Sequence, residues 1–264
     1  MMDVVTTQLP ADSGEDRLLV TRRTVAVLDG ATSCGPDVPP ATLYVDTLAD
    51  QLYRTIDDET ALPDVLREAI RSTAEKLDLQ PGAAPSSTVA IVRIDGNALD
   101  YLVLGDSPII IGWADGSVRT VADTRLADLQ LPESAAYRER LKRGSGYDER
   151  HRGLLRSLQR RGRANRNREG GYWIAEADPN AASKAITLRT PVDGIHWVVL
   201  ATDGAANPIA ALGISWHDVA RLDKPELDGL LAQCHRWESS VDPDGQYQPR
   251  SKRHDDKTIA VIRL

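Results

Sequence analysis

Apolar side chains recur along this chain at two spacings, and these spacings predict which segments form helices and which form strands. Four-residue repeats over residues 42–57 and 63–79 are typical of amphipathic helices. The first repeat has its apolar positions at Tyr44, Leu48, Leu52 and Ile56. Pro63 suits the first turn of the second helix, and Pro81-Gly82 marks its end. Three further helices are predicted near residues 208–212, 215–222 and 226–238.

Short apolar runs separated by turn residues predict antiparallel strands through the middle of the chain. Two pairs of runs are joined by an Asp-Gly turn, residues 88–94 with 99–104 and residues 109–113 with 118–121. Asp-Gly between two apolar runs is a strong hairpin signal. Other strands are predicted at residues 18–20, 25–28, 196–202 and 257–264. Strand-then-helix blocks around these hairpins predict an α+β fold in which two mainly antiparallel sheets pack face to face, with helices outside.

The composition fits one core-forming domain over residues 1–264. Hydrophobic residues make up 41% of the chain, but Phe is absent, so Leu, Val, Ile and Ala must fill the core. The formal net charge of −7 argues against a dedicated nucleic-acid binder. Cys34 and Cys234 lie far apart without a Cys-x-x-Cys pair, which favours two reduced thiols. No apolar run approaches the roughly 20 residues that span a bilayer, and signal-peptide features are missing, so we expect a cytoplasmic protein without a membrane partner.

A strongly basic segment interrupts the pattern at about residues 124–190. Between Arg138 and Arg168 there are twelve Lys or Arg against three acids, whereas the rest of the chain has a net charge of −16. Gly144-Ser145-Gly146 and Gly170-Gly171 bracket much of it, which predicts a mobile or partly helical, flap-like insertion. Such charge is typical of a solvated helix face. Nucleic acid is disfavoured as a partner, because the remaining negative charge would repel phosphate backbones.

Four short acidic motifs lie at or next to the ends of predicted strands. They are Glu15-Asp16, Asp29-Gly30, Asp203-Gly204 and Asp255-Asp256. Each alone also fits an ordinary exposed turn. Carboxylates gathered at a sheet edge repel strongly unless a cation lies between them, and oxygen-only ligands suit Mg²⁺, Mn²⁺ or Ca²⁺. Together the motifs predict a metal centre, and a metal centre favours hydrolysis.

With two further motifs, the ordered set resembles that of the metal-dependent protein phosphatases of type 2C, in a divergent, bacterial-like form. The further motifs are Ser87-Thr88 and Leu104-Gly105-Asp106-Ser107, and the last acidic motif extends to Thr258. The match runs from about residue 10 to the C-terminus. The resemblance implies a four-layer α-β-β-α sandwich with two Mg²⁺ or Mn²⁺ ions in a cleft at one end. It also implies that a hydroxide bridging the two ions attacks phosphorus directly.

The resemblance gives the acidic residues their expected roles. Asp29 would bridge both ions, the carbonyl of Gly30 would bind one of them, and Asp203 and Asp255 would bind the other. The expected catalytic residues are therefore Asp29, Asp203 and Asp255.

Three more acids of the metal centre follow from the same motifs. Glu15 would hold metal-associated water, Asp16 would support the site from behind, and Asp106 matches the position that helps to hold a weaker third ion. Asn207 stands where the family often has an Asp, which weakens that third site. Asp256 replaces the usual Asn.

Two departures from the family pattern concern recognition of the phosphate. The family has an Arg four residues before the first Glu, where this chain has Ala11, and a His directly after the first Asp-Gly, where it has Ala31. The basic insertion lies where the family carries its variable flap, and Arg side chains suit bidentate phosphate contacts. The candidate substrate-binding residues are Arg160, Arg161, Arg163, Arg166 and Arg168.

The expected function is hydrolysis of phosphoserine or phosphothreonine in proteins. Because phosphate recognition has changed, two alternatives stay open: a small-molecule phosphatase of the same fold, and a catalytically weak pseudophosphatase that binds phosphorylated partners. Gly105-Asp106-Ser107 also resembles the Gly-Asp-Ser esterases, but Ser251 stands where their Asp would precede His254. The five histidines are scattered along the sequence and are expected to be structural.

Overall fold

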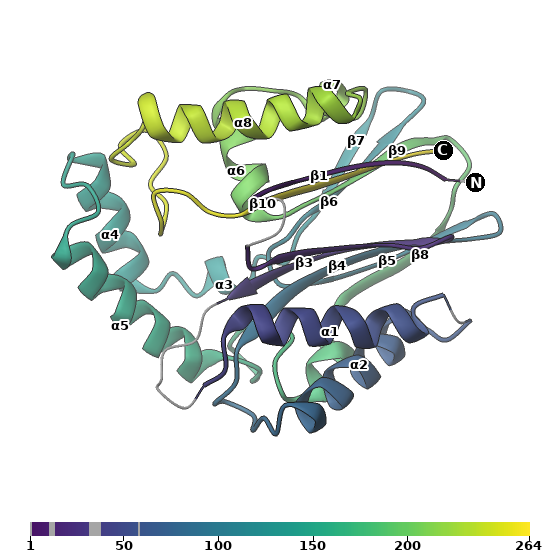
Figure 1. Cartoon of the computed structure of the whole chain (residues 1–264), viewed down its shortest axis with the longest axis horizontal. Helices are drawn as coiled ribbons and strands as arrows, with labels where there is room; N and C mark the ends of the chain where they lie inside the picture. The colour runs from purple at the N-terminus through teal and green to yellow at the C-terminus, as the bar shows by residue number, and fades with distance from the viewer. Residues whose placement is uncertain (1, 11–13, 32–37, 58) are drawn as a thin grey trace.

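A computed structural model describes residues 2–10, 14–31, 38–57 and 59–264, and it has two five-stranded sheets between layers of helices (Figure 1). Every pairing between neighbouring strands of these sheets is antiparallel. The arrangement confirms the predicted α+β sandwich. Ala11 and Cys34, on which two of the sequence expectations depend, lie outside the described residues.

The two sheets draw their strands from both ends of the chain. The first sheet consists, in spatial order, of β1 (Asp3–Leu9), β10 (Lys257–Arg263), β9 (Ile195–Ala201), β6 (Ile109–Trp113) and β7 (Val118–Val121). The second consists of β2 (Asp16–Val20), β3 (Thr24–Ala31), β4 (Ser86–Asp95), β5 (Ala98–Leu104) and β8 (Ile186–Pro191). The sequence pattern does not predict β1 and β8. Both are edge strands with few buried side chains, so backbone pairing rather than burial defines them.

Apolar residues of the inner strands alternate between two cores. In β3, Val25 and Val27 face the space between the sheets, whereas Ala26 and Leu28 face the helices. A strand that is covered on both faces reads as a continuous apolar run, and this accounts for the unbroken Val25–Leu28 segment.

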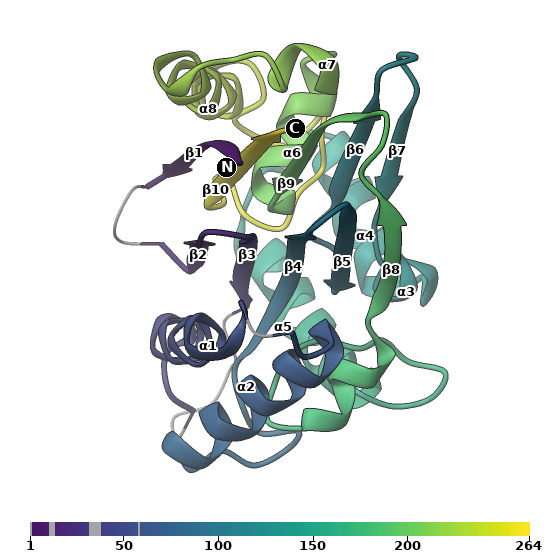
Figure 2. The same ribbon diagram turned by 90° about the vertical axis from the view of Figure 1, so that its right-hand side faces the viewer.

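Helices cover the outer face of each sheet (Figures 1 and 2). Helices α1 (Ala41–Thr55) and α2 (Leu62–Lys76) pack on the second sheet. The first sheet is covered by α6 (Asp203–Ala211), α7 (Trp216–Val219) and α8 (Lys224–Ser240). The helix α8 begins with a capping box formed by Asp223 and Glu226. Within the described part of the chain, no helix is long and apolar enough to cross a bilayer.

The predicted basic insertion contains α3 (Arg125–Asp128), α4 (Pro132–Lys142) and α5 (Glu149–Asn165), followed by a short 3-10 helix (Pro179–Lys184). The pair α4–α5 lies across one end of the sandwich (Figure 1). His151 of α5 is buried, with edge-on ring contacts to Tyr137 at 5.5 Å and Tyr147 at 5.0 Å. Asp148 caps α5 by accepting a hydrogen bond from the His151 backbone N–H at 2.8 Å. These contacts hold the two helices together.

Candidate metal centre

The topology gathers the acidic motifs at the end of the sandwich that α4 and α5 face. Asp16 and Asp29 lie directly opposite one another in the β2–β3 pair. Asp203 is the first residue of α6, immediately after β9, and Asp255 lies just before β10. Because β9 and β10 are neighbours in the first sheet, the last two carboxylates emerge side by side.

Asp29 lies at the middle of this group, and the charges of four other carboxylates change its pKa. The side chain of Asp203 is hydrogen-bonded to that of Asp29. Burial raises the pKa of Asp29 well above its ordinary value, and the charges of Asp16, Asp203, Asp255 and Asp106 raise it further. Burial, followed by the charges of Asp106 and Asp255, raises the pKa of Asp203 to about 7. Two facing carboxylates need either a shared proton or a cation between them.

Asp16 offers a buried carboxylate oxygen that has no partner among the residues the structure describes. Its Oδ2 accepts hydrogen bonds from the hydroxyls of Thr202 at 2.9 Å and Thr258 at 2.7 Å. Its Oδ1 is buried and has no hydrogen-bond partner among the described residues. Burial raises the pKa of Asp16 to about 7, despite the two hydroxyl bonds, and Asp256 and Asp255 add to the shift. Buried polar atoms are rarely left unpaired, so this oxygen fits a site for a cation or an ordered water.

Glycines allow the carboxylate-bearing segments to approach closely. A Cβ on Gly204 would lie 2.0 Å from the carbonyl oxygen of Asp256 and 3.1 Å from the Cβ of Asp255. A Cβ on Gly30 would lie 2.7 Å from the Cγ1 of Val45 and 2.8 Å from the carbonyl oxygen of Glu15. The Gly in each Asp-Gly motif therefore serves close backbone approach.

Glu15 and Asp255 share a basic neighbour that the sequence reasoning missed. The ammonium Nζ of Lys252 lies 3.0 Å from Oδ1 of Asp255 and 3.7 Å from Oε2 of Glu15. Burial alone would lower the pKa of Lys252, but Asp255, Glu15 and Asp29 outweigh it and raise the pKa. The backbone N–H of Glu15 also donates to Asp256. Because Lys252 lies in a polar loop, twelve positions before the last residue, no periodic signal in the sequence marks it.

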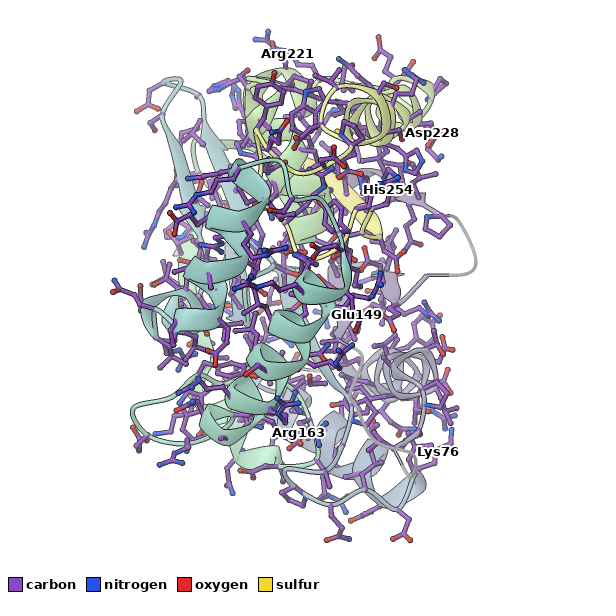
Figure 3. All side chains as sticks on the ribbon, turned by 90° about the vertical axis from the view of Figure 1, so that its left-hand side faces the viewer. Lys76, Glu149, Arg163, Arg221, Asp228 and His254 are labelled. Atoms are coloured by element: carbon purple, nitrogen blue, oxygen red, sulfur yellow. The ribbon has the colours of Figure 1, made fainter. Side chains whose placement is uncertain are left out.

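A cavity of about 400 Å³ opens over the acidic group, and its walls have opposite charge. The acidic wall contains Asp29, Asp106, Asp203 and Asp255. The other wall comes from α3, α4, α5 and the residues after α5, and it contains Leu126, Leu131, Arg138, Leu158, Arg163 and Arg166. In Figure 3, which views this end of the molecule, α4 and α5 lie in front of the sheets and the labelled Arg163 belongs to α5.

The structure separates the five predicted substrate-binding arginines into two groups. Arg163 and Arg166 line the cavity, whereas Arg160, Arg161 and Arg168 are not among its lining residues. Arg161 forms an ion pair with Glu133 at 2.9 Å.

Arg166 already has protein partners. It donates to the Ala84 carbonyl at 3.1 Å and to Glu176 at 3.3 Å, and only 10% of its side chain is exposed. The hydrogen bond to Ala84 holds the insertion against the body of the protein. Arg163 of the predicted set, and Arg138, which was not predicted, also line the cavity.

The histidines are less scattered in space than in sequence. His235, Glu238 and His254 bring potential ligand atoms within 4.8 Å of one another. However, the two imidazole rings stack at 4.2 Å with 29° between their planes, and Nδ1 of His254 lies 3.0 Å from Oε2 of Glu238. Lys257 pairs with Glu238 at 2.9 Å and donates to the Asp255 carbonyl at 2.9 Å. These contacts support a structural role, which fixes the segment that carries Asp255.

The donors at the sheet ends fit Mg²⁺ or Mn²⁺. All of them are carboxylate or carbonyl oxygens, which are the ligands of hard divalent cations. Burial, and after it the neighbouring carboxylates, raises the pKa values of Asp16, Asp29 and Asp203, and Oδ1 of Asp16 has no hydrogen-bond partner within the described ranges. A divalent cation would offset the charge of these carboxylates when they ionise.

The chain matches no protein-family model and no curated protein sequence. Solved structures nevertheless resemble it over nearly their whole length. The serine/threonine phosphatase PstP of Mycobacterium tuberculosis is 14% identical, with a TM-score of 0.55 and coverage of 100% of this chain and 98% of that chain. PppA of Pseudomonas aeruginosa, a regulatory component of T6SS, is 14% identical, with a TM-score of 0.55 and coverage of 99% and 97%. The phosphatase 2C of Toxoplasma gondii is 15% identical, with a TM-score of 0.53 and coverage of 99% and 94%. The chain therefore has the fold of the type 2C phosphatases.

A structure of the PstP catalytic domain contains two manganese ions, and its chain is 15% identical to this one, with a TM-score of 0.54 and coverage of 99% of this chain and 97% of that chain.

Proposed function

We propose that the chain is a divergent member of the type 2C family and a phosphomonoester hydrolase that depends on Mg²⁺ or Mn²⁺. The single observation that supports this most strongly is the contact between the side chains of Asp29 and Asp203, at the acidic wall of a cavity whose other wall carries arginines. The acidic wall would hold divalent cations, and the basic wall would contact an anion bound to them. A phosphate ester is such an anion.

Two ions would be held by Asp29, the Gly30 carbonyl, Asp203 and Asp255. When bound, such ions lower the pKa of a water molecule and offset charge on the phosphate oxygens. Glu15 and Asp16 would orient water and ligands from behind, and Asp106, exposed at the cavity, would contribute to a weaker third site.

The remaining residues of the site act on the substrate by binding and orientation. Arg163 and Arg138 would donate hydrogen bonds to the phosphate or to a neighbouring anionic group of the substrate. Thr202 and Thr258 hold the carboxylate of Asp16 in place through its Oδ2. Ordered carboxylates of this kind need no rearrangement during the reaction, and electrostatic catalysis depends on that order.

Phosphoserine and phosphothreonine residues of proteins are the proposed substrates, in keeping with the fold. A second candidate is a small phosphorylated molecule. The cavity itself favours this second substrate class, since about 400 Å³ between the sheets and α3–α5 is within the size range of small-ligand pockets. Leu126, Leu131 and Leu158 would give such a ligand an apolar surface.

A substrate panel tests both candidates. The Mn²⁺-loaded protein is assayed on phosphopeptides, phosphorylated metabolites and p-nitrophenyl phosphate, with Asp203→Asn as the inactive control. Turnover of phosphopeptides alone supports the protein phosphatase, and turnover of metabolites alone supports the second candidate. Background rates on all substrates, equal in wild type and variant, would instead support a pseudophosphatase and contradict the proposed hydrolase.

A further inference from the structure

Lys252 is a cation within the acidic centre, and it forms partly exposed ion pairs, whose partners are easily replaced. Its ammonium lies 3.0 Å from Asp255 and 3.7 Å from Glu15. The Lys252 side chain is 51% exposed, and those of Asp255 and Glu15 are 29% and 23% exposed. Ion pairs that water reaches contribute little net free energy, so either partner can be replaced at low cost.

The same ammonium also borders the space that a substrate would occupy. Lys252 lines the cavity together with Asp29, Asp203 and Arg163. A lysine ammonium is a compact charge on a flexible four-carbon stem, so it can follow a moving anion more readily than a planar guanidinium can.

Cations bound at Asp255 would change the partners that Lys252 prefers. A divalent ion on that carboxylate repels the ammonium, since like charges a few ångströms apart interact unfavourably even in a polar medium. A phosphate oxygen next to the ion attracts the ammonium instead. The family's phosphate-binding Arg is replaced by Ala11, so the chain has reason to supply this charge from another segment.

We infer that Lys252 exchanges between two partners: it neutralises Asp255 and Glu15 when the centre holds no metal, and it binds a phosphate oxygen when metal is present. The inference rests on the proposed function. It makes Lys252 a competitor of the metal and, at the same time, a binding residue for the substrate. Removing the charge of Lys252 should therefore strengthen metal binding and weaken phosphate binding.

The test uses Lys252→Met, which keeps the length of the side chain without its charge, and Lys252→Arg, which keeps the charge. Isothermal titration calorimetry measures Mn²⁺ binding to the metal-free protein and inorganic phosphate binding to the Mn²⁺-loaded protein. Lys252→Met should bind Mn²⁺ more tightly, by up to about 5-fold, because an exposed competing pair is lost. It should bind phosphate at least about 10-fold more weakly, because a charge-assisted hydrogen bond is lost. Lys252→Arg should retain phosphate binding within about 3-fold.

Lys76→Met, at an exposed lysine of α2, is the matched control and should change neither constant. An unchanged or weakened Mn²⁺ affinity in Lys252→Met would overturn the inference, and so would an unchanged phosphate affinity. A lysine with only a structural role would weaken both. A wild-type protein that takes up no Mn²⁺ would contradict the proposed function and, with it, this inference, whereas uptake that Lys252→Met leaves unchanged would contradict the inference alone.

Discussion

The two walls of the cavity are built in different ways. The carboxylates of the acidic wall come from segments between residues 29 and 255, and each lies at or beside the end of a strand in one of the two sheets. The arginines of the basic wall come from α4, α5 and the turn after α5, within a single insertion. The acidic wall is therefore fixed by the fold, whereas the basic wall depends on the packing of two helices against it.

This difference separates two functions within one site. The hydrogen-bonded strands of the sandwich can hold carboxylates close together in spite of their mutual repulsion. Such an arrangement suits a metal centre. Helices packed across the opening determine which ligand reaches that centre. We expect substitutions on the acidic wall to abolish the reaction, and substitutions on the basic wall to change the affinity for the substrate.

The strongest test removes a charge from the acidic wall. Asp29→Asn and Asp203→Asn should each lower kcat by on the order of 10³-fold, equivalent to about 4 kcal/mol of transition-state stabilisation, because each removes a proposed ligand of the metal pair. Mn²⁺-dependent hydrolysis of p-nitrophenyl phosphate measures the effect. Asp50→Asn is the matched control, since Asp50 lies on the exposed face of α1 near Arg54. Wild-type rates in either variant would show that the acidic wall does not perform the chemistry.

The acidic wall can be predicted from the sequence more completely than the basic wall. An Asp next to an apolar run has its place set by the strand, so Asp29 and Asp203, which follow their runs, and Asp255, which precedes one, are predicted by the periodicity together with the motif order. The sandwich itself is predicted by the hairpins. Arg163 and Arg161 lie two positions apart on one helix, in the same basic segment, and the sequence does not distinguish between them. Only the packing of α5 decides that one lines the cavity and the other pairs with Glu133.

The second test concerns the close approach that brings the acidic segments together. Gly204→Ala should lower the free energy of unfolding by about 3 kcal/mol, because its Cβ would lie 2.0 Å from the backbone oxygen of Asp256 and the strand entry must shift. Gly229→Ala on α8 is the matched control. Among the described residues, and leaving aside its chain neighbours and the backbone of α8, no atom lies within 4 Å of the added Cβ. The same change should therefore be neutral or stabilise by up to about 1 kcal/mol. Urea unfolding of both variants measures the difference, and equal stabilities would contradict the tight contact.

The third test uses the pH dependence of the metal-free protein. The folded-state pKa of Asp16, at about 7, lies above the ordinary value of 3.8 for an Asp side chain, chiefly because the carboxyl is buried. A raised carboxyl pKa stabilises the fold below the unfolded-state value, and this stabilisation is lost as the pH rises through about 7. With EDTA present, Tm should therefore fall between about pH 5 and about pH 8. Asp16→Asn should reduce this fall by about 5 °C, or about 2 kcal/mol for a chain of this size.

The pH test has its own internal comparison. Asp50→Asn, the exposed control, should leave the slope of Tm against pH unchanged, and saturating Mn²⁺ should raise the wild-type Tm more at about pH 8 than at about pH 5, because its ligands must be ionised. Parallel curves for wild type and Asp16→Asn would mean that this carboxyl is not held protonated by burial.

The smallest expected effect compares two arginines of the same helix. Arg163→Ala should raise KM about 10-fold with kcat nearly unchanged, because it removes a charge-assisted contact to the substrate from the cavity. Arg161→Ala, two positions earlier, should change KM by less than about 2-fold, since Arg161 pairs with Glu133 and does not line the cavity. Both parameters are measured on the best substrate of the panel. Equal KM values for the two variants would show that the basic wall does not bind the substrate through α5, and that the acidic wall alone determines affinity.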